Sequence, residues 1–94
     1  MAAPIMTSHA LVRAQQRGIP AQVIDWVLSF GNERHDHRGA SLFFFDKRAK
    51  RRLGTALGQS AARTAADFGD VYAVVNGFGA VVTVGYRTKR LPAA

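Results

Sequence analysis

One histidine and two arginines are spaced along the chain as an α-helix and an anionic ligand would require. His9, Arg13 and Arg17 follow one another at intervals of four residues. On an α-helix such residues stack along one side, because 3.6 residues make a turn. That side presents two permanent cations beside an imidazole, the side chain best suited to act as base or acid near neutral pH. The combination suits binding of a phosphodiester and could move a proton beside one.

Metal-free cleavage of RNA is the reaction that these residue types could perform. It needs a base for the 2′-hydroxyl proton, an acid for the leaving 5′-oxygen and cations that stabilise the developing charge. His9 could be the base or the acid, and Tyr86 could donate a proton or stack on a nucleobase. The cations that could hold the phosphate are Arg13, Arg17 and Arg87. The alternative is that His9 packs or caps locally and that the arginines form a solvated face.

A second basic cluster crowds the first two turns of a helix that Asp46 can cap. Cations at that end oppose the helix dipole, and a bound phosphate would relieve the conflict. The cluster could follow a nucleic-acid backbone or bind an acidic partner, or it could be an ordinary solvated face. Lys47 begins the run, and its candidate nucleic-acid contacts are Arg48, Lys50, Arg51 and Arg52.

Composition favours one small domain with an anionic partner. The 94 residues carry 13 Lys and Arg against 6 Asp and Glu, a net charge of +7. Most of the cations are Arg, whose planar donor fork matches phosphate oxygens, as in proteins that bind nucleic acid or acidic partners. The chain has no Cys, which excludes disulfides and thiolate–metal sites and fits a reducing compartment.

The chain shows neither a signal peptide nor an apolar run of the roughly 20 residues that span a membrane. We therefore expect a cytoplasmic protein without a membrane partner. No cofactor is expected either, because Gly77 and Gly79 belong to a turn that no helix follows.

Two N-terminal helices are predicted from apolar periodicity. The first covers residues 8–17, with Thr7 or Ser8 as its cap and Gly18 placed to end it in the left-handed conformation. The second covers residues 20–30 and has an apolar stripe that should face the core. That stripe consists of Val23, Ile24, Val27 and Leu28.

Two β-hairpins are predicted after these helices. Residues 33–37 form a polar strand, and residues 41–45 form an apolar strand whose two apolar faces indicate a central position. Residues 71–75 and 80–87 form the second hairpin around the turn at 76–79.

A third helix joins the hairpins, and residues 59–67 are either its tail or a loop. The elements predict an α+β fold with a mainly antiparallel sheet of about four strands and helices packed on it. Residues 1–94 form one domain, with 1–6 and 89–94 expected to be flexible tails. The apolar stripe of the third helix consists of Ala49, Leu53, Ala56 and Leu57.

Two further features have open interpretations. His35 and His37 share one face of a strand and could begin a zinc site or supply a second acid–base group near His9. A polar edge strand without a ligand is the more common explanation. Phe78, at a turn tip, is the aromatic residue expected to be most exposed, where it could contact a partner.

Short motifs near both ends of the chain resemble one bacterial family, the domain of unknown function 4258. They are Ser8-His9-Ala10 with Arg13, Arg17-Gly18-Ile19, Val27-Leu28 with Gly31, and Val81-Val82-Thr83-Val84 leading into Tyr86-Arg87. The family looks like a relative of RelE/ParE-type toxins, small basic proteins with N-terminal helices on an antiparallel sheet. RelE-like members cut RNA without a metal, and ParE-like members act on a topoisomerase. The resemblance implies a toxin-like module, whose partner would be an acidic antitoxin peptide over the basic surface.

These observations lead to one principal hypothesis and two rivals. The principal hypothesis is a RelE/ParE-like domain that binds RNA or another polyanion and could cleave RNA without a metal. The first rival is a non-catalytic module that binds nucleic acid or an acidic protein. The second is a homodimer that pairs through a strand edge and an apolar surface. Loss of His9 would abolish activity of a nuclease, whereas charge reversal at Arg51 and Arg52 would matter more for a binding module.

Overall fold

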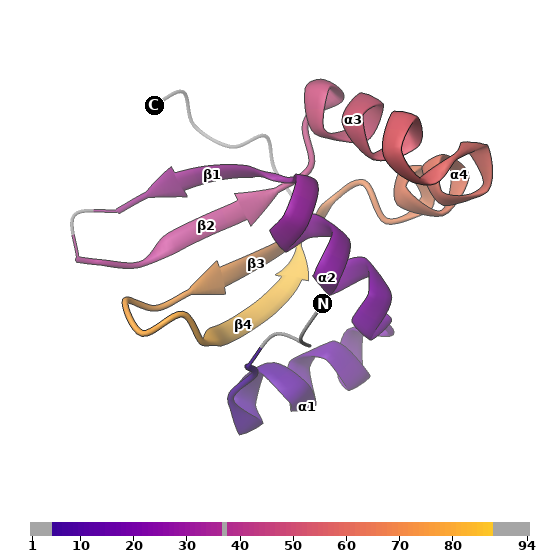
Figure 1. Ribbon diagram of the computed structural model, residues 1–94. Coiled ribbons are helices and arrows are strands. Elements are labelled where there is room, and N and C mark those ends of the chain that lie inside the picture. The colour runs from indigo at the N-terminus through magenta and orange to yellow at the C-terminus, as the bar shows by residue number, and fades with distance from the viewer. Residues whose placement is uncertain (1–4, 37, 88–94) are drawn as a thin grey trace.

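Two helices, a hairpin, two more helices and a second hairpin follow one another along the chain (Figure 1). The computed structural model describes residues 5–36 and 38–87. Its elements are α1 (Ser8–Arg17), α2 (Ala21–Phe30), β1 (Asn32–His35), β2 (Ser41–Phe44), α3 (Lys47–Leu57), α4 (Gln59–Asp67), β3 (Val71–Val75) and β4 (Val81–Tyr86).

The four strands form one sheet in the order β1-β2-β3-β4, and every neighbouring pair is antiparallel. The predicted α+β class and the central position of β2 are confirmed. Both hairpin turns lie at the end of the sheet that faces away from α3 and α4 (Figure 1). Side chains alternate along each strand, so each strand contributes to two different faces.

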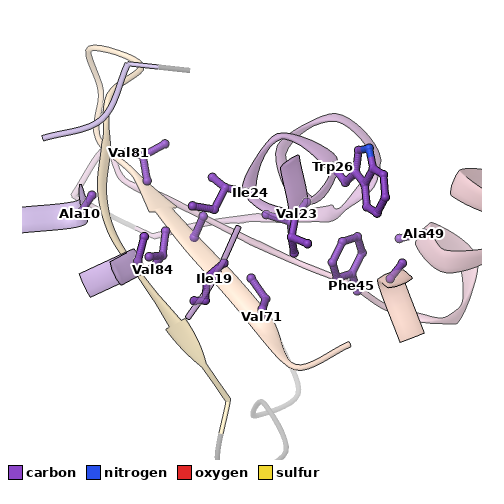
Figure 2. Close-up of a cluster of buried hydrophobic side chains, with 14 of the residues drawn as sticks. Ala10, Ile19, Val23, Ile24, Trp26, Phe45, Ala49, Val71, Val81 and Val84 are labelled. Atoms are coloured by element: carbon purple, nitrogen blue, oxygen red, sulfur yellow. The ribbon is translucent and has the colours of Figure 1, made fainter. Parts of the chain in front are cut away.

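One face of the sheet packs against α1 and α2 and forms the core. Ala73 and Val84, which are register partners on β3 and β4, are both buried there. Trp26 of α2 lies beside Phe45 and Ala49, which joins the core of the sheet to α3 (Figure 2). We call the opposite face the second face; it carries Arg34, Leu42, Phe44, Tyr72 and Val74.

The helix α1 is capped as predicted, but the segment before it is not a free tail. The Thr7 hydroxyl accepts from the Ala10 amide at 3.2 Å, and Gly18 ends the helix with φ +64°. Residues 5–6, assigned from sequence to a flexible tail, instead pair with β4. The Val81 amide donates to the Ile5 carbonyl at 2.8 Å, because the outer edge of β4 offers backbone groups that need partners. Residues 1–4 and 89–94 lie outside the described part of the chain.

The segment between the hairpins contains two helices. Residues 59–67, left open between helix and loop, form α4. The helices α3 and α4 approach closely, since a Cβ built on Gly54 would lie 3.2 Å from that of Ala62. Ala56 and Leu57, which the sequence assigns to the apolar stripe of this helix, are both exposed. They occupy the last turn of α3, just before the chain turns into α4, and the core contacts of this helix come from Ala49 and Leu53.

Candidate nucleic-acid interface

The three residues that opened the sequence argument lie on α1 as their spacing predicts. Ala10 and Ala14 bury one side of the helix, while His9 and Arg17 are exposed. Arg13 is half-buried, and its Nε atom is buried without a hydrogen-bond partner in the described structure. The exposed part of this side therefore offers one imidazole and one guanidinium, with Arg13 set back between them.

Tyr86 and Arg87 point to opposite faces of the sheet. Tyr86 pairs with the fully buried Val71 and packs against the core beneath the helices. The next side chain along the strand alternates to the other side, and the guanidinium of Arg87 lies over Phe44 of the second face. The phenol of Tyr86 and the guanidinium of Arg87 therefore do not act on the same side of the sheet.

His9 lies at the other end of β4 from both of these residues. The Thr7 amide donates to the carbonyl of Val81, the first residue of β4, and His9 follows in the first turn of α1. Tyr86 is the last residue of that strand, about 17 Å further along at the usual rise per residue. His9 is thus separated from Tyr86 and Arg87, whereas Arg13 and Arg17 follow it on α1.

Arg87 is instead bound within the protein. Its Nη2 donates to the carbonyls of Phe45 at 3.0 Å and Gly69 at 3.3 Å, and its backbone amide donates to the backbone carbonyl of Asp70 at 2.7 Å. Its guanidinium carbon lies 5.2 Å from the centroid of the Phe44 ring. These contacts fasten the end of β4 to the segments that enter and leave the α3–α4 pair.

Arg34 is a second cation at the same ring, and the sequence argument did not single it out. Its guanidinium carbon lies 5.3 Å from the Phe44 centroid. The alternation of side chains along the strands of the first hairpin could have indicated this contact. Arg34 pairs with Leu42, and Leu42 shares its face of the sheet with Phe44, two residues later. The strand register, which short-range patterns do not specify, decides that contact.

A hollow of about 300 Å³ lies on the second face near the β1–β2 turn. Leu42 and Val74 contribute apolar surface to it, and Arg34 and Ser41 add polar groups. Beside it, the Ser41 hydroxyl lies 3.0 Å from His35 Nδ1, and the other ring nitrogen lies 3.6 Å from the Glu33 carboxylate.

The zinc hypothesis was based on His35 and His37. His37 lies outside the described residues. Among the residues that are described, no group of three or more His, Cys, Asp or Glu side chains is close enough to hold a metal.

The basic cluster on α3 divides into bound and free side chains. Arg52 donates to the Phe30 carbonyl at 2.7 Å, where its charge complements the C-terminal end of α2. Lys50 is half-buried and covers Gly69, since a Cβ built there would lie 2.7 Å from the lysine Nζ. Arg48 and Arg51 are exposed, and neither guanidinium group makes a hydrogen bond or an ion pair within the described part of the chain.

The N-terminus of α3 already has an anionic partner. Asp46 Oδ1 accepts from the Ala49 amide at 2.7 Å, and Oδ2 accepts from the Asn32 side chain at 3.1 Å. This carboxylate offsets the conflict between the helix dipole and the cations, as a phosphate was expected to do. A polyanion at this helix would therefore contact the side chains of Lys47, Arg48 and Arg51 rather than the free amides of its first turn.

Comparisons with family models, with curated proteins and with solved structures gave no match for this chain. The resemblance to the domain of unknown function 4258 and to RelE/ParE-type toxins therefore stays a prediction. Within the described residues, no helix has the length and apolar character needed to cross a membrane.

Proposed function

We propose that the protein binds RNA or another polyanion, without cleaving it, through the exposed cations of α3. These cations are Lys47, Arg48 and Arg51, which we call the α3 cluster. The observation that carries the proposal is that Arg48 and Arg51 are exposed and that their side chains lack protein partners among the described residues. Their guanidinium groups are therefore free to bind phosphate oxygens.

The spacing of the α3 cluster supports this role. Residues three and four apart on a helix have Cβ atoms about 5–6 Å from each other. Lys47 and Arg51 are four apart, and Arg48 and Arg51 are three apart, so the three cations form one small surface. Several adjacent cations release several counterions when a polyanion binds, and this release makes the largest contribution to non-specific affinity.

Binding is favoured over cleavage because of where the candidate catalytic residues lie. General acid–base catalysis requires its groups within hydrogen-bond reach of the same substrate. His9 stands at the start of β4, Tyr86 packs against the core at the other end, and Arg87 binds two carbonyls. The α3 cluster needs no such convergence, since each cation can contact a different phosphate.

The experiment compares two charge reversals of equal size on two helices. Arg51→Glu alters the α3 cluster, and Arg17→Glu alters the exposed cation of α1, so both lower the net charge equally. Binding of a fluorescent single-stranded RNA is measured by anisotropy over a range of salt concentrations. We expect Arg51→Glu to weaken binding by about 10-fold and to reduce the salt slope by about 0.7. Arg17→Glu should have the smaller effect.

Three results would contradict the proposal. Equal losses from both reversals would indicate general charge attraction rather than a surface on α3. No binding by the wild-type protein at low salt, where phosphate contacts are strongest, would exclude RNA and redirect the search to an acidic protein. Shortened RNA on a gel of the same samples, absent from a His9→Ala preparation, would show cleavage at α1.

A further inference from the structure

Phe78 lies at the tip of the β3–β4 hairpin with its side chain in solvent. It is 94% exposed, the highest value among the large hydrophobic side chains of the described residues. Hydrogen bonds define the loop backbone: the Asn76 side-chain oxygen accepts from the amides of Phe78 at 2.9 Å and Ala80 at 3.0 Å. The Asn76 amide also donates to the Ala80 carbonyl at 2.9 Å. The backbone that carries the aromatic ring is thus already hydrogen-bonded before any ligand binds.

A cation stands on the neighbouring turn. The two hairpin turns touch, since a Cβ built on Gly77 would lie 3.5 Å from the Gly39 carbonyl oxygen. Arg38, directly before Gly39, is exposed, and its backbone amide donates to the Asp36 carboxylate at 2.8 Å. The tip of the sheet therefore combines a bare aromatic face with a guanidinium.

We propose that Phe78 stacks on an unpaired base of single-stranded RNA while Arg38 contacts its backbone. An aromatic ring beside cations is the usual arrangement for single strands, because every base has a face for stacking and every linkage a charge. The net charge of +7 favours such a polyanion over a neutral partner. The inference rests on the proposed function and adds to it a preference for unpaired bases.

The position of the tip makes it a contact separate from the α3 cluster. Both hairpin turns lie at the end of the sheet that faces away from α3 (Figure 1). The strand β2 separates the two contacts: it begins at Ser41, beside the turn, and ends at Phe44, three residues before the start of α3. A probe of about 12 nucleotides, within the range of site sizes for single-strand binding domains, is suitable for both contacts.

The test measures binding of a single-stranded oligouridine of about 12 nucleotides and of a blunt RNA duplex by anisotropy. Phe78→Ala should weaken binding of the single strand by about 10-fold, as expected for one lost stacking contact. Phe78→Trp should retain the affinity, and Phe78→Leu should lose it although the side chain stays apolar. Duplex binding should change little in the three Phe78 variants, because only the two end pairs of a duplex offer a free face.

A matched control lies close by. Ile5 is also apolar and exposed, and its carbonyl accepts from Val81 just beyond the hairpin loop. Ile5→Ala should leave RNA affinity unchanged, because an aliphatic side chain does not stack. Stacking carries no charge, so Phe78→Ala should also keep the wild-type salt slope, unlike Arg51→Glu. Circular dichroism of each variant checks that the fold is retained.

Several outcomes would overturn the inference. Unchanged single-strand affinity in Phe78→Ala, with wild-type binding and the Arg51→Glu effect intact, would reject it and leave the proposed function standing. Wild-type affinity in Phe78→Leu would reject stacking as its basis. A wild-type dimer in light scattering that both Phe78→Ala and Ile5→Ala dissociate, with RNA binding unaltered, would assign the tip to a second copy of the chain. If the wild-type protein binds no RNA at low salt, the inference fails with the proposed function.

Discussion

The guanidinium carbon of Arg87 lies 5.2 Å from the centre of the Phe44 ring, and Nη2 of the same group donates to the Phe45 carbonyl. One side chain thus binds two consecutive residues at the end of β2. A second bond from Nη2 to Gly69 holds the chain that enters β3. Arg87 therefore connects the end of β4 to the centre of the sheet.

Replacement of Arg87 by Ala should destabilise the fold. The variant leaves two carbonyls without their charged donor and uncovers one side of Phe44, so we expect a loss of about 2–3 kcal/mol in the free energy of unfolding. Arg87→Lys should lose less stability, because an ammonium group can replace one of the two hydrogen bonds but not the planar contact with the Phe44 ring. Urea denaturation measures both. An Arg87→Ala protein of wild-type stability that no longer binds RNA would instead identify a ligand contact.

Gly85 provides space for the ring of Tyr72, its register partner on β3. A Cβ built on Gly85 would lie 3.0 Å from the Tyr72 hydroxyl oxygen and 3.1 Å from two ring carbons. Gly85→Ala should therefore cost about 1 kcal/mol or more by displacing the ring. In a Tyr72→Ala background the same change should be neutral or stabilising, because the contact is absent and alanine restricts the unfolded chain. Thermal unfolding of the wild type, the two single variants and the double variant gives the coupling free energy between the two positions. Additive effects of the two substitutions would contradict the steric argument.

Asp46 caps α3 and is the nearest anion in sequence to the α3 cluster. Asp46→Ala should lower the free energy of unfolding by about 1 kcal/mol, while Asp46→Asn should lose less because its amide oxygen can still accept from Ala49. Asp46→Asn should also bind RNA more tightly at low salt, since one negative charge is removed. Stability and anisotropy measurements on the same preparations separate the two effects. Weaker RNA binding by Asp46→Asn would place the polyanion elsewhere.

His9 is exposed, so its replacement tests its chemical role without a large change in packing. We expect His9→Ala to change the free energy of unfolding by less than about 0.5 kcal/mol, as for most surface substitutions. RNA affinity should also be close to wild type, and RNA should remain intact with either protein. Differential scanning fluorimetry and gel analysis of the RNA provide the two measurements. A marked fall in RNA affinity would show that the α1 side takes part in binding.

The order and type of the elements were largely predictable because they follow from local chemistry. Apolar spacing placed both N-terminal helices, and the N-cap at Asp46 and the left-handed position at Gly18 depend only on neighbouring residues. The prediction was less successful for residues 56–57, which were assigned to an apolar stripe, and for residues 5–6, which were assigned to a flexible tail. In both places packing against a distant segment, and not the local pattern, decides which side chains are covered and which backbone groups pair.

The candidate site was predictable in its residue types but not in its geometry. The sequence alone determined the excess of cations, the basic helix after Asp46 and the exposed aromatic at the hairpin tip. Only the tertiary structure decided that Tyr86 and Arg87 face opposite ways, and that Arg52 binds a carbonyl of α2 while Arg51 remains free. Charge and local conformation are properties of a short segment. Which groups meet depends on strand register and helix packing, which join segments far apart in the chain.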